Sequence, residues 1–243
     1  MAGSRHKAQA LVLAGQVLVG EQKVEKPGRL VDPGSEIRIL RPSPFASRAG
    51  AKLQAAVDHF KISAAGRICA DLGASTGGFT DCLLQNGADR VYAFDVGKGQ
   101  LAWKLQSDPR VVVRDRFNVR ELRAEDLPEG ISLITVDLSF ISVTKVLPAL
   151  MRALKHKRDS AEALEKIPVE VVVLVKPQFE AGKGEVGKGG IVRDPAKRAR
   201  ILEAIEEFSR QAGFRVVGSI PSPVPGAAGN LEFLLDLELP KGL

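Results

Sequence analysis

The sequence predicts an α/β protein whose main domain holds one mostly parallel sheet of seven strands, preceded by a small α+β module. Three observations support this. The 243 residues fit one α/β domain of ordinary size plus an appendage. Hydrophobic residues make up 44% and charged residues 26%, which allows a packed core. From residue 47 onward, apolar runs of strand length alternate with helical periodicity, the pattern of a parallel sheet covered by helices on both faces.

The first forty residues differ in character from the rest. Residues 6–15 predict an amphipathic helix that ends at Gly15, residues 16–28 a strand, a turn and a second strand, and residues 35–40 a third strand. Such a helix and sheet bury little surface by themselves. A proline-rich segment follows and predicts a linker. The expected division is therefore a module over 1–41, a linker over 42–46 and the main domain over 47–243.

The main domain begins with a helix over 47–60, for which Ser47 is the expected N-cap. A long helix is expected over 194–213, with Asp194 as N-cap and Pro195 at the first helical position. No helix separates the last two strands, so the final strand should run antiparallel. The seven expected strands span 67–73, 90–97, 110–115, 131–139, 169–175, 214–223 and 231–239. The other expected helices span 77–87, 100–108 and 146–157.

Charge and composition narrow the function classes. The net charge of +6 and the pI of about 9.4 favour a polyanionic partner. Cys69 and Cys82 lack paired-motif spacing, so a disulfide framework is not expected and a reducing compartment is. Three scattered histidines offer no zinc constellation. There is no signal peptide and no apolar run of about 20 residues. We therefore expect a soluble, cytoplasmic protein with no metal site and no stable membrane insertion.

Polar and small residues follow three neighbouring strands at the edge where open α/β sheets bind ligands. The small residues of 71–78 let the backbone approach a ligand and lead directly into a helix. Asp95 ends the second strand about 20 residues further on, where an acidic side chain binds ribose hydroxyls. Asp115 and Asn118 follow the third strand and suit the edge of an adenine. These features predict an adenosine-type cofactor.

The glycine pattern separates two such cofactors. A nicotinamide dinucleotide favours G-x-G-x-x-G, which "GASTGG" at 73–78 does not fit. S-adenosylmethionine has no pyrophosphate and needs close backbone contact, so it is the better candidate. The competing interpretation is a tight turn with solvated carboxylates. The residues expected at the cofactor site are Asp71, Gly73, Ala74, Ser75, Thr76, Gly77, Gly78, Phe79, Asp95, Val96, Asp115, Asn118 and Asp137.

Four ionisable residues are expected to converge at the same edge. Asp137 ends the fourth strand and Lys176 the fifth, directly after the apolar run 171–175. The antiparallel final strand begins here and brings Glu232, and Lys52 on the first helix covers the site. Buried charges need partners. We expect Lys176 to steer or accept the proton of a sugar hydroxyl as that oxygen attacks a methylsulfonium, with positioning supplying much of the acceleration. The alternative is that each lysine extends its ammonium to water.

The loop after this lysine, residues 178–194, is rich in glycine and basic residues. Lys183, Lys188 and Arg193 suit a flap that contacts phosphates, and a solvated loop is the competing interpretation.

Six motifs together resemble the TlyA family of ribosomal RNA 2′-O-methyltransferases, part of the wider FtsJ/RrmJ-like group. They are "SRAGAKL", "DLGASTGGFTDCLLQ", "VDLSFIS", "LVKPQFE", "GIVRD" and "GNLE". The resemblance covers nearly the whole chain and implies a Rossmann-like class I methyltransferase fold. It further implies that S-adenosylmethionine is used to methylate cytidine ribose in ribosomal RNA, in 16S RNA, 23S RNA or both. The group's Lys–Asp–Lys–Glu tetrad corresponds here to Lys52, Asp137, Lys176 and Glu232.

Residues 7–28 resemble an S4 RNA-binding domain, which the same family carries at its N-terminus. Such a domain usually begins with one more helix, so a truncated module is expected. The implied partners are ribosomal RNA and ribosomal subunits. The residues expected to contact RNA are Arg5, Lys7, Arg48, Lys183, Lys188 and Arg193.

Three other functions remain open at this point. A non-catalytic ribosome-associated factor would bind S-adenosylmethionine and RNA without turnover. A nicotinamide oxidoreductase would bind NADH instead. Family members are also labelled haemolysins, although the sequence contains no membrane-spanning helix and no strongly amphipathic membrane helix to support a lytic role.

Overall fold

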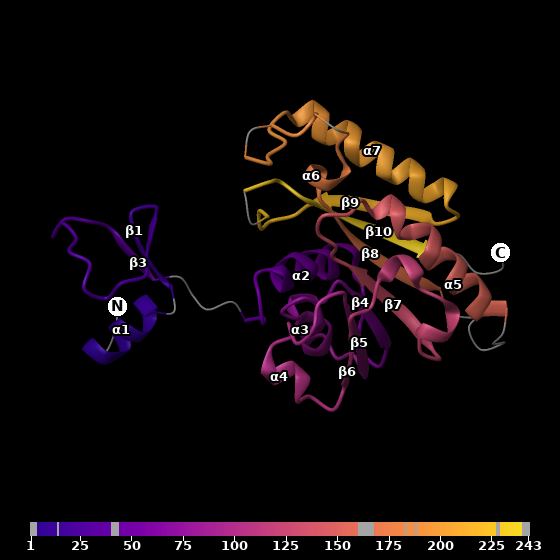
Figure 1. The fold of residues 1–243 in the computed structure, drawn as a ribbon, viewed down its shortest axis with the longest axis horizontal. Helices are drawn as coiled ribbons and strands as arrows, with labels where there is room; N and C mark the ends of the chain where they lie inside the picture. The colour runs from indigo at the N-terminus through magenta and orange to yellow at the C-terminus, as the bar shows by residue number, and fades with distance from the viewer. Residues whose placement is uncertain are drawn as a thin grey trace. The chain divides into compact units, whose positions relative to one another are not determined.

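The computed structural model describes residues 4–13, 15–39, 44–159, 168–182, 184–187, 189–226 and 229–239. It separates into two compact units, Met1–Pro44 and Phe45–Leu243, each described here by itself (Figure 1). The division lies within the linker expected from the sequence.

The described residues of the N-terminal unit form one helix, α1 (Arg5–Leu13), and a small antiparallel sheet in the order β2-β1-β3. Its strands are β1 (Val17–Val19), β2 (Gln22–Val24) and β3 (Ile37–Ile39). The predicted helix and three strands are therefore confirmed. The buried hydrophobic side chains of its described residues are those of Val17 and Val24, so its core is small.

The larger unit is built on a seven-stranded sheet in the order β6-β5-β4-β7-β8-β10-β9. Pairing is parallel from β6 to β8, and β10 is antiparallel to both of its neighbours. The predicted α/β class, strand number and antiparallel last strand are confirmed. The strands are β4 (Ile68–Leu72), β5 (Arg90–Asp95), β6 (Val111–Asp115), β7 (Ile131–Val136), β8 (Val169–Val175), β9 (Arg215–Pro221) and β10 (Phe233–Leu239).

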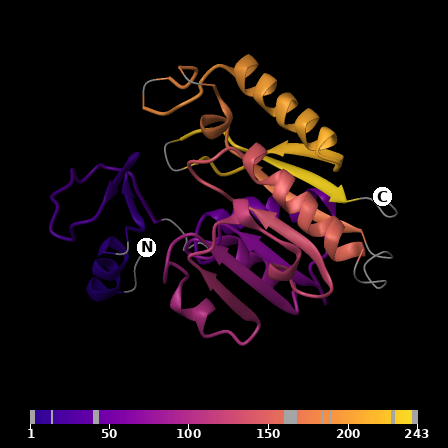
Figure 2. The same ribbon diagram turned by 45° about the vertical axis from the view of Figure 1, so that its right-hand side comes forward.

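Helices cover both faces of this sheet (Figures 1 and 2). On one face lie α2 (Ala49–Phe60), α3 (Gly78–Gln85) and the single turn α4 (Trp103–Gln106); on the other lie α5 (Leu147–Asp159) and α7 (Pro195–Gln211). Each face has its own apolar cluster. The short helices are η1 (Val119–Glu121), η2 (Ala124–Asp126), η3 (Val143–Lys145) and α6 (Pro177–Glu180).

Strand β8 is covered on both faces of the sheet, which explains its unbroken run of apolar residues. Val171, Val173 and Val175 pack into one apolar cluster, while Val172 and Leu174 pack into the other. Each such burial contributes about 1.5–3 kcal/mol relative to exposure. The strand ends because Pro177 occupies the first position of α6, which leaves Lys176 at the carboxyl edge of the sheet.

Helix ends agree with the predictions in one place and differ in two. The Asp194 carboxylate caps α7 by accepting from the amide of Ala196 at 2.9 Å. The prediction for Ser47 is wrong, because α2 begins at Ala49 and Arg48 is its N-cap. The helix expected over 100–108 shrinks to α4, because Ala102 is extended and its amide donates to the carbonyl of Thr76.

Candidate active site

The turn between β4 and α3 is held tightly against the neighbouring strands. Gly73 has φ 92°, and a Cβ there would lie 2.4 Å from the carbonyl oxygen of Asp137. The amides of Gly73 and Ala74 both donate to the carbonyl of Phe94. Only glycine fits this backbone conformation at so close an approach. The turn is thereby fixed where β4, β5 and β7 end.

Asp95 ties this turn to the end of β5. Its carboxylate accepts from the amides of Ser75 at 2.8 Å and Gly97 at 2.7 Å. Two acceptor oxygens offer about four lone-pair sites, so capacity remains for ligand hydroxyls. Asp95 can therefore hold its own loop and bind a ligand at the same time.

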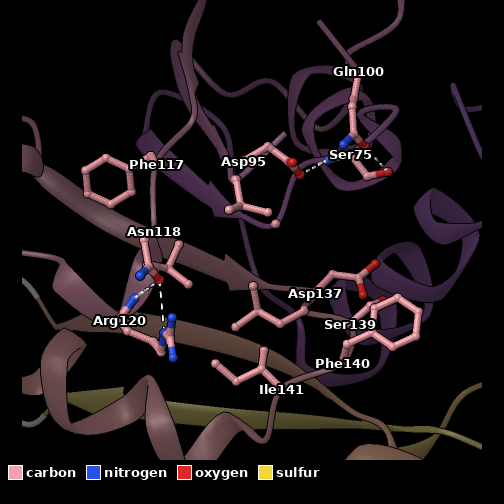
Figure 3. A pocket seen from close by; sticks show the side chains of 14 residues that line it. Ser75, Asp95, Gln100, Phe117, Asn118, Arg120, Asp137, Ser139, Phe140 and Ile141 are labelled. Carbon is pink, nitrogen blue, oxygen red and sulfur yellow. Dashed lines mark hydrogen bonds between the residues drawn. The ribbon is translucent and has the colours of Figure 1, made fainter. Parts of the chain in front are cut away.

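A cavity of about 560 Å³ opens at this edge of the sheet (Figure 3). It is called the cofactor cavity below. Asp95 and Ser75 lie on one side, Phe117 and Asn118 at one end, and Asp137 on the opposite side. Among the predicted cofactor residues, those that line it are Gly73, Ser75, Asp95, Val96, Asn118 and Asp137.

A second cavity, of about 490 Å³, is lined by Lys52, Lys176 and Glu232, among others. It is called the acceptor cavity below. Lys52 Nζ lies 2.5 Å from Glu232 Oε2, and Lys176 Nζ lies 2.6 Å from Asp137 Oδ1. The lysine side chains are each 10% exposed, so each depends on its partner. Antiparallel pairing of Phe233 with Val175 places Glu232 near Lys176. The four predicted charges thus come together as two ion pairs.

A small joining cavity of about 140 Å³ lies between these two. It shares Gly73 and Asp137 with the cofactor cavity and Lys176 with the acceptor cavity. A group bound in one cavity would therefore meet a group bound in the other beside the Asp137–Lys176 pair. Four more predicted cofactor residues line the joining cavity: Ala74, Thr76, Gly78 and Phe79.

Three predicted cofactor residues, Asp71, Gly77 and Asp115, do not line these cavities. Asp71 is buried, and burial raises its pKa to about 6 although the hydroxyls of Thr80 and Thr135 donate to it. The Asp115 carboxylate accepts from the amide of Gly99 at 2.9 Å. From outside the cavities, Asp71 thus links β4 to α3 and β7, and Asp115 holds the loop at Gly99.

Three of the residues predicted to contact RNA have described side chains. Arg48 is exposed and lines the acceptor cavity, and Arg193 is exposed just before α7. Arg5 is exposed in the N-terminal unit. The predictions for Lys183, Lys188 and the side chain of Lys7 lie outside the described residues.

Several lining residues escaped the sequence analysis. Phe140 lines both large cavities, is 91% exposed and has φ 64°, a strained backbone for a bulky residue. Its ring lies 5.2 Å from that of Phe179. Gln178 donates to Glu232 at 3.3 Å. Gln100 and Arg120 line the cofactor cavity. These residues lie in loops and single-turn helices, which are too short to show a periodicity, although a phenylalanine three residues after a strand-end aspartate was a usable signal.

The sheet order, its single antiparallel strand and a cavity at the carboxyl edge define a methyltransferase of the doubly wound α/β type. The comparison with protein families agrees. The chain belongs to the FtsJ-like methyltransferase family, whose family model matches residues 45–239, and an S4 domain matches residues 1–37.

Named relatives and a solved structure extend this comparison. The 16S/23S rRNA (cytidine-2′-O)-methyltransferase TlyA of Mycobacterium tuberculosis is 44% identical over 97% of this chain and 84% of its own length. Hemolysin A of Brachyspira hyodysenteriae is 44% identical over 95% of this chain and 92% of its own. The solved structure of a Streptococcus thermophilus protein that is named as a candidate hemolysin is 41% identical in sequence to this chain. It superposes with a TM-score of 0.76 over 97% of this chain and 82% of its own.

Within the described part of the chain, every helix is too short or too polar to cross a lipid bilayer.

Proposed function

We propose that this protein uses S-adenosylmethionine to methylate the 2′-hydroxyl of a cytidine ribose in ribosomal RNA. One observation carries the proposal. A cofactor cavity and an acceptor cavity meet beside the buried Asp137–Lys176 pair. The family is one of methyltransferases, and the mycobacterial relative is named for this reaction.

The residues around the cofactor cavity fit S-adenosylmethionine. A volume of about 560 Å³ suits a ligand of nucleoside size. Asp95 has free lone pairs for ribose hydroxyls, and Phe117 and Ile141 supply apolar surface for an adenine. The missing side chain at Gly73 keeps the turn open to close contact. When bound, S-adenosylmethionine supplies a methyl group on a positively charged sulfur.

The two ion pairs have different roles in this proposal. Lys176 lines both the acceptor and the joining cavity, so it is placed to hold the acceptor hydroxyl and take its proton. Asp137 fixes the Lys176 side chain and balances the resulting charge. Lys52 and Glu232 form a neutral wall of the acceptor cavity. Holding both reactants in line is worth roughly 7–11 kcal/mol of the barrier.

Features of the acceptor side favour a nucleic acid. A 2′-hydroxyl target makes the substrate RNA. Phe140 and Phe179 offer aromatic surface on which a base can stack. We propose phosphate contacts for Arg48 and Arg193, and for Arg5, Lys7, Lys183 and Lys188 as the sequence predicts. The S4 match over residues 1–37 supports ribosomal RNA as the partner, and the cytoplasm as the location.

The test is transfer of label to RNA. The purified chain is incubated with radiolabelled S-adenosylmethionine and unmodified ribosomal subunits, and the RNA is digested to nucleosides. Label is expected in 2′-O-methylcytidine. Unlabelled RNA from a protein that still binds S-adenosylhomocysteine would reject the reaction and favour a non-catalytic RNA-binding factor.

The hemolysin names of two relatives motivate one alternative, membrane lysis. Liposomes filled with a self-quenched dye separate the two functions. No dye release is expected at protein concentrations that give complete RNA methylation.

A further inference from the structure

Ser139 lies where the cavities of the site meet. It lines the cofactor, acceptor and joining cavities, and no other described residue lines all three. Its side chain is exposed, two residues after Asp137 and next to Phe140 (Figure 3). A methyl group passing from one cavity to the other would pass beside its hydroxyl.

The hydrogen bonds of Ser139 leave its own proton free. Ser139 Oγ accepts from Lys176 Nζ at 3.0 Å, and Lys176 is also paired with Asp137 at 2.6 Å. A serine hydroxyl has one donor and two acceptor positions. No described residue accepts the hydroxyl hydrogen of Ser139. An unused O–H donor therefore lies at the junction.

We propose that Ser139 donates this hydrogen bond to the 2′-oxygen of the acceptor ribose and is a further catalytic residue. The role rests on the proposed function. To accept a proton, the Lys176 ammonium, with its three N–H groups, must first release a proton from one of them to solvent. The resulting amine has two N–H groups and one lone pair. Lys176 Nζ donates to Ser139 Oγ and lies 2.6 Å from Asp137 Oδ1. With its two N–H groups engaged by these neighbours, the lone pair would be left for the proton of the 2′-hydroxyl.

The 2′-oxygen has two bonds and two lone pairs, and each of these four then has an assigned role. One is its bond to C2′, and the second is the O–H bond, whose proton passes to Lys176 Nζ. A third, one lone pair, forms the bond to the methyl carbon while the carbon–sulfur bond breaks and its electron pair stays on sulfur. Ser139 holds the fourth, the other lone pair, and so fixes the direction of the attacking one.

The first test measures single-turnover transfer from labelled S-adenosylmethionine to unmodified ribosomal subunits. Ser139→Ala is expected to lower the rate about 10- to 100-fold, the loss for one hydrogen bond to a group that gains charge. Ser139→Thr should keep most of the rate. Ser142→Ala is the matched control, because that hydroxyl lies in the same loop but bonds Glu180. The affinity for S-adenosylhomocysteine, measured by calorimetry, should change less than about 2-fold in Ser139→Ala.

The second test involves no turnover. An RNA fragment containing the target cytidine in its unmethylated form is compared with the same fragment carrying 2′-deoxycytidine, both bound to protein saturated with S-adenosylhomocysteine. Wild type should prefer the ribose form by about 2- to 10-fold, and Ser139→Ala should show a smaller preference, since Lys176 still contacts the 2′-hydroxyl. An unchanged preference, or a rate in Ser139→Ala no lower than in Ser142→Ala, overturns the role. Absence of transfer by wild type overturns the proposed function and this role with it.

Discussion

The two halves of the site are held together in different ways. In the cofactor half, carboxylates bond backbone amides of nearby loops, as Asp95 does with Ser75 and Gly97. In the acceptor half, side chains pair across the fold, and Lys52 and Glu232 are 180 residues apart. The first half needs only a correct turn after each strand. The second forms only when α2, which carries Lys52, and β10, which Glu232 precedes, are both in place.

This difference determines which property a substitution in each half is expected to change. Removing a carboxylate that bonds amides leaves neutral groups that water can satisfy, so ligand affinity should suffer most. Removing one member of a buried ion pair leaves an uncompensated charge, which costs stability and disturbs the reacting groups.

The largest effect is expected for Lys176→Ala, which removes the proposed proton acceptor. Methyl transfer should fall about 10²- to 10⁴-fold, the usual contribution of a positioned acid or base. Single-turnover assays measure the rate, and calorimetry with S-adenosylhomocysteine checks that the cofactor cavity is intact. Lys176→Arg should not restore transfer, because a guanidinium keeps its proton. Substantial activity in the arginine variant would contradict a proton-accepting role.

Removing one partner of the Lys52–Glu232 pair should be the largest effect on stability. Lys52→Met leaves the Glu232 carboxylate buried and without its cation, at a cost of about 3–5 kcal/mol in the free energy of unfolding. Urea titration measures the loss. The double variant Lys52→Met/Glu232→Gln should recover a large part of it. The exposed Arg210–Glu207 pair is the control, and Glu207→Gln should cost at most about 1 kcal/mol. Equal costs at the two sites would mean that burial of the first pair is unimportant.

In the cofactor half, Asp95→Asn should act on affinity. An asparagine cannot accept from both amides and keep free acceptors for a ribose. Binding of S-adenosylhomocysteine should weaken by about 1.5–3 kcal/mol, while transfer at saturating S-adenosylmethionine stays within a few-fold of wild type. Asp115→Asn is the control, because Asp115 lies outside the cavities. A loss of maximal rate without a loss of affinity would contradict the assignment of Asp95 to cofactor binding.

The smallest effect concerns a buried carboxylate outside the site. Asp236 on β10 has one carboxylate oxygen without a hydrogen-bond partner among the described residues. Burial, with repulsion from Glu170 and Glu238, raises its pKa to about 7. The folded protein therefore keeps a proton there that the unfolded chain loses near pH 4, so stability falls as pH rises from about 4 to about 7.

Asp236→Asn removes that titration. Its urea midpoint should exceed that of wild type by more at pH 8 than at pH 5. Some pH dependence of the same sign should remain, because the pKa of Asp71 is also raised, to about 6. An equal difference at the two pH values would show that Asp236 is not protonated in the folded state near neutral pH.

Much of this architecture follows from sequence pattern. The apolar run Val171–Val175 required cover on both faces, and the missing helix between β9 and β10 required an antiparallel last strand. Those two inferences also place Asp137, Lys176 and Glu232 at one edge, since the carboxyl ends of parallel strands meet at the same edge of the sheet and an antiparallel strand begins there. Lys52 followed less directly, from a helix expected to cover that edge.

Other features depend on loop geometry, which the hydrophobic periodicity of the sequence does not predict. Asp115 was expected at an adenine edge, and no periodicity indicates the bond that its carboxylate accepts from the amide of Gly99. Phe140 and Phe179 come together only because the loops after β7 and β8 meet in space. Ser47 carried the right side chain for a cap, yet Arg48 occupies the capping position. In each case a backbone conformation, and not the residue type, decides the outcome.

The central claim is that the two cavities meet at the Asp137–Lys176 pair. A crystal structure of the protein with S-adenosylhomocysteine tests it most directly. We predict that the adenine lies at the Phe117–Asn118 end, the ribose hydroxyls bond Asp95, and the sulfur faces the joining cavity between Asp137 and Lys176. A sulfur directed toward Arg120, or a ligand bound away from Asp95, would contradict the account.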